Sequence, residues 1–182
     1  MFKHMAIVKN NYVRRGRGER SRAKATIRYI AHRPGKDGAK ITRTLFGRDG
    51  VMDRSGAYLM IDEAEGGSIF FRFVISPDPQ TEDTKRDIAL REITEKTMLS
   101  LEECINKQVQ WTAAVHADHA EHRHVHVVAV TPGRLSRQDF QALPGVMRQV
   151  ATQACLAERR ERDLTREQQE RSREGGEWEL ER

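Results

Sequence analysis

Histidine is concentrated in one short stretch of the chain. Five of the seven histidines fall within the eleven residues from His116 to His126. Side chains alternate between the two faces of a β-strand, so His124 and His126 should point to the same side, with His116 facing them from the preceding strand of a hairpin. Three imidazoles can bind a divalent ion and still leave coordination positions open for water or substrate. The pattern predicts a catalytic metal centre rather than a closed structural site.

The other polar residues of this stretch are less informative. His119 and His122 lie in the loop of the predicted hairpin and are more simply explained as surface residues. Valines flank His124 and His126, so their strand should be mostly buried, and burying two polar rings without partners is costly. Asp118 is a candidate to accept the second N–H of a ligating ring, which would fix its tautomer, but a turn-forming aspartate explains it equally well.

The elements that position these residues follow from the hydrophobic periodicity. The N-terminal third predicts a short strand over Met5–Lys9, a mobile basic loop over about 10–20, and a helix from Arg22 to about Ala31 capped by Ser21. Tyr29 shares one face of this helix with arginines. The residues of that face, at i, i+4, i+7 and i+11, are Arg22, Thr26, Tyr29 and Arg33.

The rest of the chain predicts a sheet flanked by helices. Two β-rich runs, Gln108–Ala117 and Arg123–Thr131, form the histidine hairpin, and Trp111 falls on the opposite face, in the core. We expect these strands and helices to form an α+β fold in one domain over residues 1–174, with a flexible tail over 175–182. The other predicted elements are short strands near 42–46 and 57–61, a strand over 68–76, a helix from Thr81 or Asp83 to Ile105, a helix that begins at Ser136 and is interrupted at Pro144, and a charged C-terminal helix over about 146–173.

Charge is distributed unevenly along the chain. Residues 1–54 contain 15 lysines and arginines against 4 acidic residues, a net charge of +11, whereas residues 55–182 contain 17 against 23, a net charge of −6. Basic side chains that neutralise phosphates release the counterions bound there, which favours binding. The basic N-terminal third therefore indicates contact with a polyanion, and nucleic acid is the leading candidate. A solvated arm that improves solubility explains the charge alone equally well. The candidate DNA-binding residues are Arg14, Arg15, Arg17, Arg20, Arg22, Lys24, Arg28 and Arg33.

Two other classes of protein are excluded by composition. No apolar run approaches the roughly 18 residues of a membrane-spanning helix, so we expect no membrane insertion and a cytoplasmic protein. Cys104 and Cys155 each lie inside a helical pattern rather than in a paired or metal-binding spacing. We therefore expect neither a disulfide scaffold nor a thiolate zinc site.

Three motifs, in a fixed order along the chain, resemble those of a family of DNA-processing enzymes. They are Tyr29 in the helix Ala23-Lys24-Ala25-Thr26-Ile27-Arg28-Tyr29-Ile30, the strand end Phe71-Arg72-Phe73-Val74-Ile75-Ser76-Pro77, and His116-x7-His124-Val125-His126. Over about residues 20–160 the chain resembles the MobA/VirD-type DNA relaxases, which are mobilisation nickases of the HUH endonuclease superfamily. The resemblance implies a five-stranded antiparallel sheet flanked by helices. It also implies that Tyr29 is the nucleophile, that the three histidines bind the metal, and that Ser76 lies near the bound strand, although turn chemistry explains Ser76 equally well.

The resemblance also implies an activity. It implies a metal-dependent, site- and strand-specific endonuclease and strand transferase that nicks single-stranded DNA at an origin of transfer through a covalent 5′-phosphotyrosine intermediate, initiating conjugative plasmid mobilisation. The cofactor would be Mg²⁺ or Mn²⁺, or else Zn²⁺, since imidazole ligands alone do not select among them. The partners would be single-stranded or supercoiled DNA at the origin, accessory relaxosome proteins and a coupling protein. Relatives often carry a long C-terminal extension, so we expect either a minimal relaxase or a fragment of a longer one.

Tyr29 is one of three tyrosines. A tyrosine oxygen that attacks phosphorus holds the cut end as an ester, so the strand can be rejoined. A free tyrosine titrates far above neutral pH, and Arg28, Arg33 and the metal are candidates to favour its phenolate. If Tyr29 is only a half-buried helix aromatic, Tyr12 in the basic loop is the second candidate nucleophile and Tyr58, interpreted as a strand residue, is the third.

Two rival functions stay open at this point. A replication initiator or transposase of the same superfamily would use the same three histidines with a tyrosine after them, and no tyrosine follows His126 in the sequence. A non-catalytic, metal-stabilised DNA-binding accessory protein would keep all its activity in the Tyr29→Phe variant. That protein would also unfold when its metal is chelated.

Overall fold

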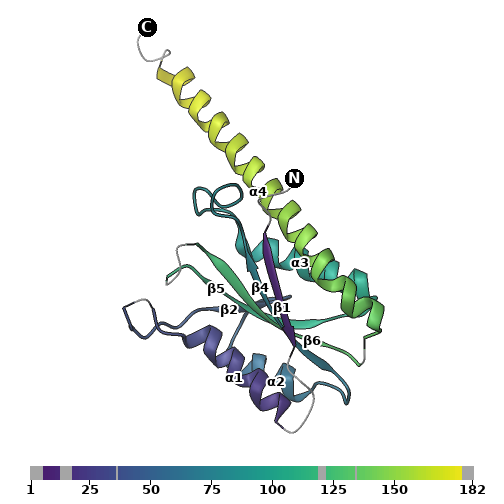
Figure 1. Ribbon diagram of the computed structural model, residues 1–182. Coiled ribbons are helices and arrows are strands. Elements are labelled where there is room, and N and C mark those ends of the chain that lie inside the picture. The colour runs from purple at the N-terminus through teal and green to yellow at the C-terminus, as the bar shows by residue number, and fades with distance from the viewer. Residues whose placement is uncertain (1–5, 13–17, 36, 119–121, 134, 178–182) are drawn as a thin grey trace.

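The computed structural model describes residues 6–12, 18–35, 37–118, 122–133 and 135–177. Over these residues the chain has the predicted α+β fold, with four helices and a single antiparallel sheet of six strands, one more than expected (Figure 1). The order of strands across the sheet is β1-β4-β6-β5-β2-β3. The elements are β1 (Ile7–Tyr12), α1 (Glu19–His32), β2 (Leu45–Gly47), β3 (Gly50–Met52), α2 (Arg54–Asp62), β4 (Ile69–Ser76), α3 (Leu90–Ile105), β5 (Gln110–His116), β6 (His124–Thr131) and α4 (Arg137–Glu177).

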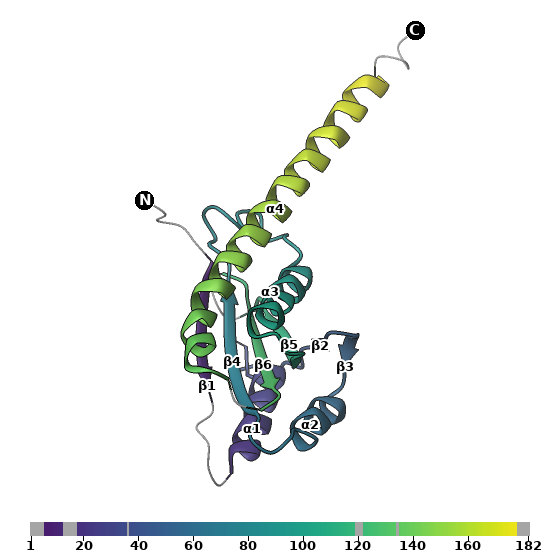
Figure 2. The ribbon, with the colours of Figure 1, turned by 90° about the vertical axis from the view of Figure 1, so that its right-hand side faces the viewer.

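The sheet separates two helical layers, each with its own hydrophobic core. Helices α3 and α4 pack on one face, over a core that contains Phe71, Phe73 and Trp111. Helices α1 and α2 pack on the other face, over a smaller core that includes Phe70 and Val128 (Figures 1 and 2). Trp111 is buried, which confirms its predicted place in the core. The C-terminal part of α4 extends beyond the sheet (Figures 1 and 2).

The middle of the sheet carries the histidines. β6 pairs along its length with β5, over Gln110–His116, and with β4, over Ile69–Ile75. In an antiparallel pair, directly opposed residues project from the same face, so this register decides which side chains meet. The predicted hairpin is confirmed, with its second strand beginning at His124.

Helix α1 begins three residues earlier than predicted. It starts at Glu19, after Gly18, and no side chain caps it, so the predicted cap by Ser21 was wrong. Gly18 has a φ of 84°, a conformation that glycine adopts without steric cost. Glu19 in the first turn is favoured by the helix dipole. The buried stripe is the predicted one, Ala23, Ile27, Ile30 and Ala31.

The segment 57–61 is helical, so its prediction as a strand was wrong. Helix α2 begins after Asp53, whose side chain accepts a hydrogen bond from the Gly56 N–H at 2.7 Å. The buried side chains of α2 are those at helical spacing, Ala57, Met60 and Ile61. A run this short fits a strand or a helix from the sequence alone. Tyr58, interpreted as a strand residue, is therefore a helix residue.

β1 is longer than predicted and contains Tyr12. It pairs with β4 over all six of its residues, so Tyr12 lies in a strand rather than in the basic loop. Of the predicted loop over about 10–20, residues 13–17 lie outside the described residues. Arg14, Arg15 and Arg17, predicted to bind DNA, are among them.

Helix α3 begins at Leu90 rather than at Thr81 or Asp83. The Asp83 carboxylate accepts two hydrogen bonds from the Arg123 guanidinium instead of capping a helix at this position. Arg86 has a φ of 54°, in the left-handed region that an α-helix does not contain. The segment between β4 and α3 is instead held by contacts with distant residues, among them Arg123 before β6 and Arg159 of α4.

Helix α4 is continuous over Arg137–Glu177, so the predicted interruption at Pro144 was wrong. A proline inside a helix removes one main-chain hydrogen bond. Leu143 and Met147, however, are fully buried in the same core on either side of it. That packing offsets the lost hydrogen bond. The helix includes the first residues of the predicted tail, and residues 178–182 lie outside the described residues.

Candidate metal centre

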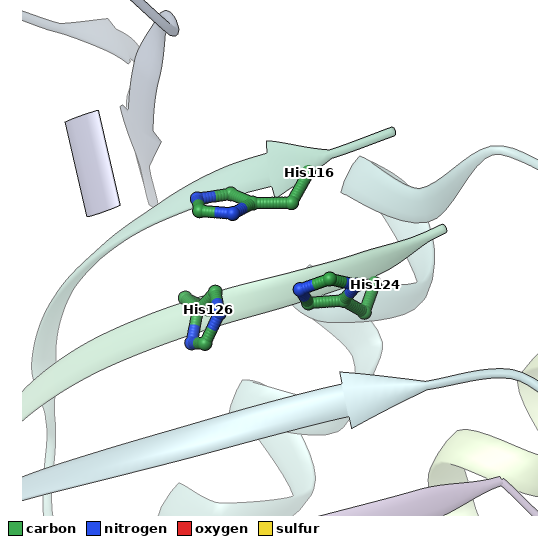
Figure 3. A group of neighbouring side chains, drawn as sticks. All are labelled: His116, His124 and His126. Carbon is green, nitrogen blue, oxygen red and sulfur yellow. The ribbon is translucent and has the colours of Figure 1, made fainter. Parts of the chain in front are cut away.

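The three histidines of the predicted metal centre meet at the ends of β5 and β6. His116 pairs directly with His124, and His126 lies on the same face of β6 (Figure 3). One ring nitrogen from each histidine lies within 4.8 Å of those from the other two. Metal–nitrogen bonds of about 2 Å in tetrahedral geometry place ligand atoms about 3.4 Å apart. Small rotations of the rings would therefore bring the three nitrogens around one ion.

A hydrogen bond from helix α1 orients the His116 ring. This ring is fully buried, and its Nε2 lies 2.8 Å from the carbonyl oxygen of Ile30. Because a carbonyl oxygen only accepts, Nε2 carries the proton and Nδ1 carries the lone pair. Ligating histidines are commonly held in this way, through a hydrogen bond from the ring nitrogen that does not bind the metal.

The cluster is open to solvent on the side of His126. His124 is 9% exposed and His116 is inaccessible, whereas His126 is half-buried. His122 is exposed, with its ring centroid 6.2 Å from that of His124, and it is not one of the converging ligands. His119 lies outside the described residues. An ion held by the three buried or half-buried rings would therefore keep a position accessible to a substrate.

Tyr29 lies beside this cluster. Its ring meets that of His126 edge to face, with centroids 6.4 Å apart and planes at 84°. The Arg33 guanidinium lies 5.4 Å from the centroid of the Tyr29 ring, within the range of a cation–π contact. The Tyr29 side chain is 48% exposed, so its phenol is accessible from solvent. Tyr29, in the last turn of α1, thus lies between the histidine cluster and Arg33, which follows the helix as its C-cap.

Asp118, predicted to orient a ligating ring, forms an ion pair with Arg43. The Arg43 guanidinium donates from Nε to Asp118 Oδ1 at 3.2 Å and from Nη2 to Oδ2. Its remaining nitrogen, Nη1, donates to the Arg33 carbonyl oxygen at 2.8 Å. The acceptor for the His116 ring N–H is instead the Ile30 carbonyl, a main-chain group that has no signature in the sequence.

The predicted DNA-binding residues of α1 divide into two groups. Arg20 donates to main-chain carbonyl oxygens at the C-terminal end of α2, and Lys24 forms an ion pair with Asp62 at 2.6 Å. These two side chains hold α1 against α2. Arg22 and Arg28 are exposed. The exposed pair is therefore better placed for a polyanion than Arg20 and Lys24.

Ser76 ends β4 on the histidine face of the sheet. It pairs with Ile7 of β1 and is 7% exposed. By strand alternation it shares the face of Val74, which pairs with His126. Ser76 is therefore near the histidine cluster along the paired strands, but its side chain is largely buried.

Two basic residues that were not among the predicted site residues lie on the same face. Lys9, Val74 and His126 form one row across β1, β4 and β6. At about 4.8 Å between strands, Lys9 stands about 10 Å from His126 along this row. Arg72, two residues before Val74, projects from the same face, and both basic side chains are exposed. Their alternation was visible in the sequence, but the pairing of β1 with β4 was not.

A buried ion pair holds the start of β6. Arg123, which precedes His124, donates from Nε to Asp83 Oδ2 at 2.8 Å and from Nη2 to Oδ1 at 2.6 Å. Asp83 is 4% exposed, and the same Nη2 reaches the Ile88 carbonyl oxygen at 3.1 Å. A two-pronged guanidinium–carboxylate pair fixes geometry as well as charge. The segment after β4 is thereby fastened to the strand that carries two of the histidines.

Comparisons of the chain with protein-family models, with curated proteins and with solved structures find no match. Among the described residues, no helix has both the length and the apolar character needed to cross a membrane. A function for this protein therefore has to be inferred from the residues of the site.

Proposed function

We propose that this protein is a metal-dependent DNA strand transferase of the relaxase type, which nicks single-stranded DNA through a covalent bond to Tyr29. The observation that carries the proposal is the exposed Tyr29 ring, 6.4 Å from the ring of His126 in a cluster of three histidines. Transesterification of a phosphodiester needs an attacking oxygen beside a site that neutralises the phosphate. The proposed substrate is single-stranded DNA at an origin of plasmid transfer. The reaction would take place in the cytoplasm, with accessory relaxosome proteins and a coupling protein as partners.

The donor set fits a divalent cation. Three neutral imidazoles preserve the full charge of the ion. They suit Mn²⁺ or Zn²⁺ better than Mg²⁺, and the supply of each metal in the cell also determines which one is bound. When bound, the ion would orient a non-bridging phosphate oxygen and stabilise the charge that develops there. The ligands would be Nδ1 of His116 and one nitrogen each of His124 and His126.

The reaction itself would be carried by Tyr29. Its Oη forms a bond to phosphorus, and the bond from phosphorus to the 3′-oxygen of the preceding nucleotide breaks. The phenol loses a proton and the leaving 3′-oxygen gains one, so the products are a 5′-phosphotyrosyl strand and a free 3′-hydroxyl. The Arg33 guanidinium, 5.4 Å from the Tyr29 ring centroid, would favour the negative charge that develops on the phenol oxygen. Attack by a 3′-hydroxyl on the ester reverses the step and rejoins the strand.

The exposed basic residues of the sheet support a path for the DNA. From His126 the row of paired residues crosses Val74 to Lys9, with Arg72 beside it. Arg22 is exposed on α1. Cations spaced along a face that leads to the cluster would follow a phosphate backbone, which supplies most of the affinity for single strands.

The experiment that tests this proposal is capture of a covalent adduct. The protein is incubated with Mn²⁺ and a pool of labelled single-stranded oligonucleotides that have a randomised central region. Adducts that survive denaturation are recovered, the DNA is sequenced to give the preferred site, and mass spectrometry identifies the linked peptide. Tyr29→Phe is the test variant, and Tyr58→Phe, on the neighbouring helix α2, is the matched control.

We expect an adduct linked to Tyr29, retained in Tyr58→Phe and lost in Tyr29→Phe, with DNA binding intact in all three proteins. An adduct mapped to Tyr12 would keep the reaction class and overturn the role of Tyr29. Binding of the pool without any adduct, together with unfolding by a chelator, would favour the accessory DNA-binding protein instead.

A further inference from the structure

We infer that Arg43 is a positioning residue, which fixes Tyr29 relative to the histidine cluster. Arg43 lies between α1 and β2 along the chain, outside the motifs that carry the relaxase resemblance. Its side chain is only 6% exposed, although it carries a permanent charge. A buried guanidinium requires partners, and those of Arg43 lie just beyond the ends of the two elements that carry the proposed nucleophile and the first proposed ligand.

One set of contacts binds the C-terminal end of α1. The Arg43 N–H donates to the Ala31 carbonyl oxygen at 2.9 Å, and Nη1 donates to the Arg33 carbonyl oxygen at 2.8 Å. The last carbonyl groups of a helix have no partner within the helix, so external donors hold that end in place. Tyr29 is in this last turn, and the Arg33 N–H donates to the Tyr29 carbonyl oxygen at 2.8 Å.

The other set of contacts binds the end of β5. Nε and Nη2 of Arg43 both donate to the Asp118 carboxylate, two residues after His116. Arg43 thus spans from the backbone beside the proposed nucleophile to the strand end beside a proposed ligand. The hydrogen bond of His116 to Ile30 connects the same two elements at a second point. Together the Arg43 bridge and the His116 hydrogen bond restrict rotation of α1 over the cluster, whereas a single connection would still allow the helix to rotate about it.

A lysine cannot replace this arrangement. The three guanidinium nitrogens are held in one plane and reach two acceptors on different elements, whereas an ammonium is a single point of charge. Arg43→Lys should keep the charge near Asp118 and lose the bridge to Arg33. Asp118→Asn removes the ion pair from the other side, at a residue exposed enough to tolerate the change.

The inference rests on the proposed function only for its effect on rate, so it is tested with two readouts. The first is ¹⁹F NMR of protein labelled with 3-fluorotyrosine, whose three signals are assigned with Tyr→Phe variants. The second is the single-turnover rate of adduct formation with the recovered oligonucleotide, measured with its binding affinity. The variants are Arg43→Lys and Asp118→Asn, and the control is Arg48→Lys, in a distant ion pair with Glu102.

In both test variants we expect the Tyr29 signal to shift or broaden while that of Tyr58 stays unchanged. Adduct formation should slow by about 10- to 100-fold with little loss of DNA affinity, because a displacement of about 1 Å at a reacting group has effects of this size. An unchanged Tyr29 signal with an unchanged rate would overturn the inference. A shifted Tyr29 signal in a protein that forms no adduct would support the positioning role and reject the proposed function.

Discussion

His116 donates a hydrogen bond to the carbonyl oxygen of Ile30, the residue that follows Tyr29 in helix α1. The first proposed ligand and the proposed nucleophile are therefore joined through one main-chain group. That bond assigns the proton of the His116 ring to Nε2 and directs the Nδ1 lone pair toward the other two histidines. It also means that the helix is positioned by a residue of the candidate metal centre.

Metal should stabilise the folded protein without being needed for folding. The histidines lie on strands that are paired on both sides in the middle of the sheet, so we expect the fold to form without the ion. With Mn²⁺ or Zn²⁺ at 100 times its dissociation constant, we expect the free energy of unfolding to rise by about 2.7 kcal/mol. Thermal unfolding with and without metal measures this gain.

The gain should be lost in His126→Gln and kept in His122→Gln, which removes an exposed histidine outside the converging set. A chelator should return the wild-type protein to its metal-free stability. Unfolding of the wild type by the chelator would instead identify a structural ion.

The ion pair between Arg123 and Asp83 should contribute strongly to stability. Removing one member of a buried pair leaves an uncompensated charge, so we expect Asp83→Ala to lower the free energy of unfolding by about 3 kcal/mol. The double variant Asp83→Ala with Arg123→Met should recover much of this loss, because no charge then stays buried. A double-mutant cycle tests this expectation. Urea unfolding gives the free energy of unfolding for the wild type, both single variants and the double variant.

The same variants report on the histidines. Because Arg123 directly precedes His124, loss of the pair should also weaken binding of Mn²⁺ in titrations below the unfolding transition. Additive losses in the cycle, with metal affinity unchanged, would show that the pair does not hold this strand end.

The core of the candidate site was predictable because its residues are close in sequence. The alternation in β6 and the nearness of β5 in sequence are local features, so the meeting of His116, His124 and His126 could be predicted from them. The nearness of Arg33 to Tyr29 was predictable for the same reason, although Arg33 follows α1 rather than belonging to its face. What the sequence did not contain was which surface this helix face would meet.

The contacts that were missed join segments far apart in sequence. Arg43 and Asp118 are separated by 75 residues, and Arg123 and Asp83 by 40. Neither pair belongs to a periodic pattern that could identify it. The α2 segment was predicted wrongly for a different reason, because five residues with an apolar majority fit a strand or a helix equally well.

Lys9 and Arg72 should contribute to DNA affinity through phosphate contacts. Replacing either with glutamine should weaken binding of single-stranded oligonucleotides similarly for different sequences, and reduce the salt dependence by about 0.7 in the log–log slope, the value for one phosphate contact. Fluorescence anisotropy over a range of salt concentrations measures the slope.

The control for this pair is Arg160→Gln, an exposed arginine of α4, which packs on the opposite face of the sheet. It should leave the slope unchanged. Equal slopes for wild type, Lys9→Gln and Arg72→Gln would place the DNA elsewhere.

The contact between α4 and the segment before α3 should depend on pH through Asp87. Burial acts to raise the pKa of Asp87, but hydrogen bonding to Arg159 and the charges of Arg159, Arg166 and Arg162 outweigh it, so the pKa is lowered. A carboxyl group with a lowered pKa in the folded state stabilises the fold above its usual pKa of about 3.9, and this contribution is lost as the pH falls through the folded value.

At neutral pH, Asp87→Asn should lower the free energy of unfolding by about 1–3 kcal/mol, because it weakens hydrogen bonds to charged groups. Urea unfolding at about pH 7 and about pH 3 should show the difference between variant and wild type shrinking at the lower pH, whereas a difference independent of pH would assign the cost to packing.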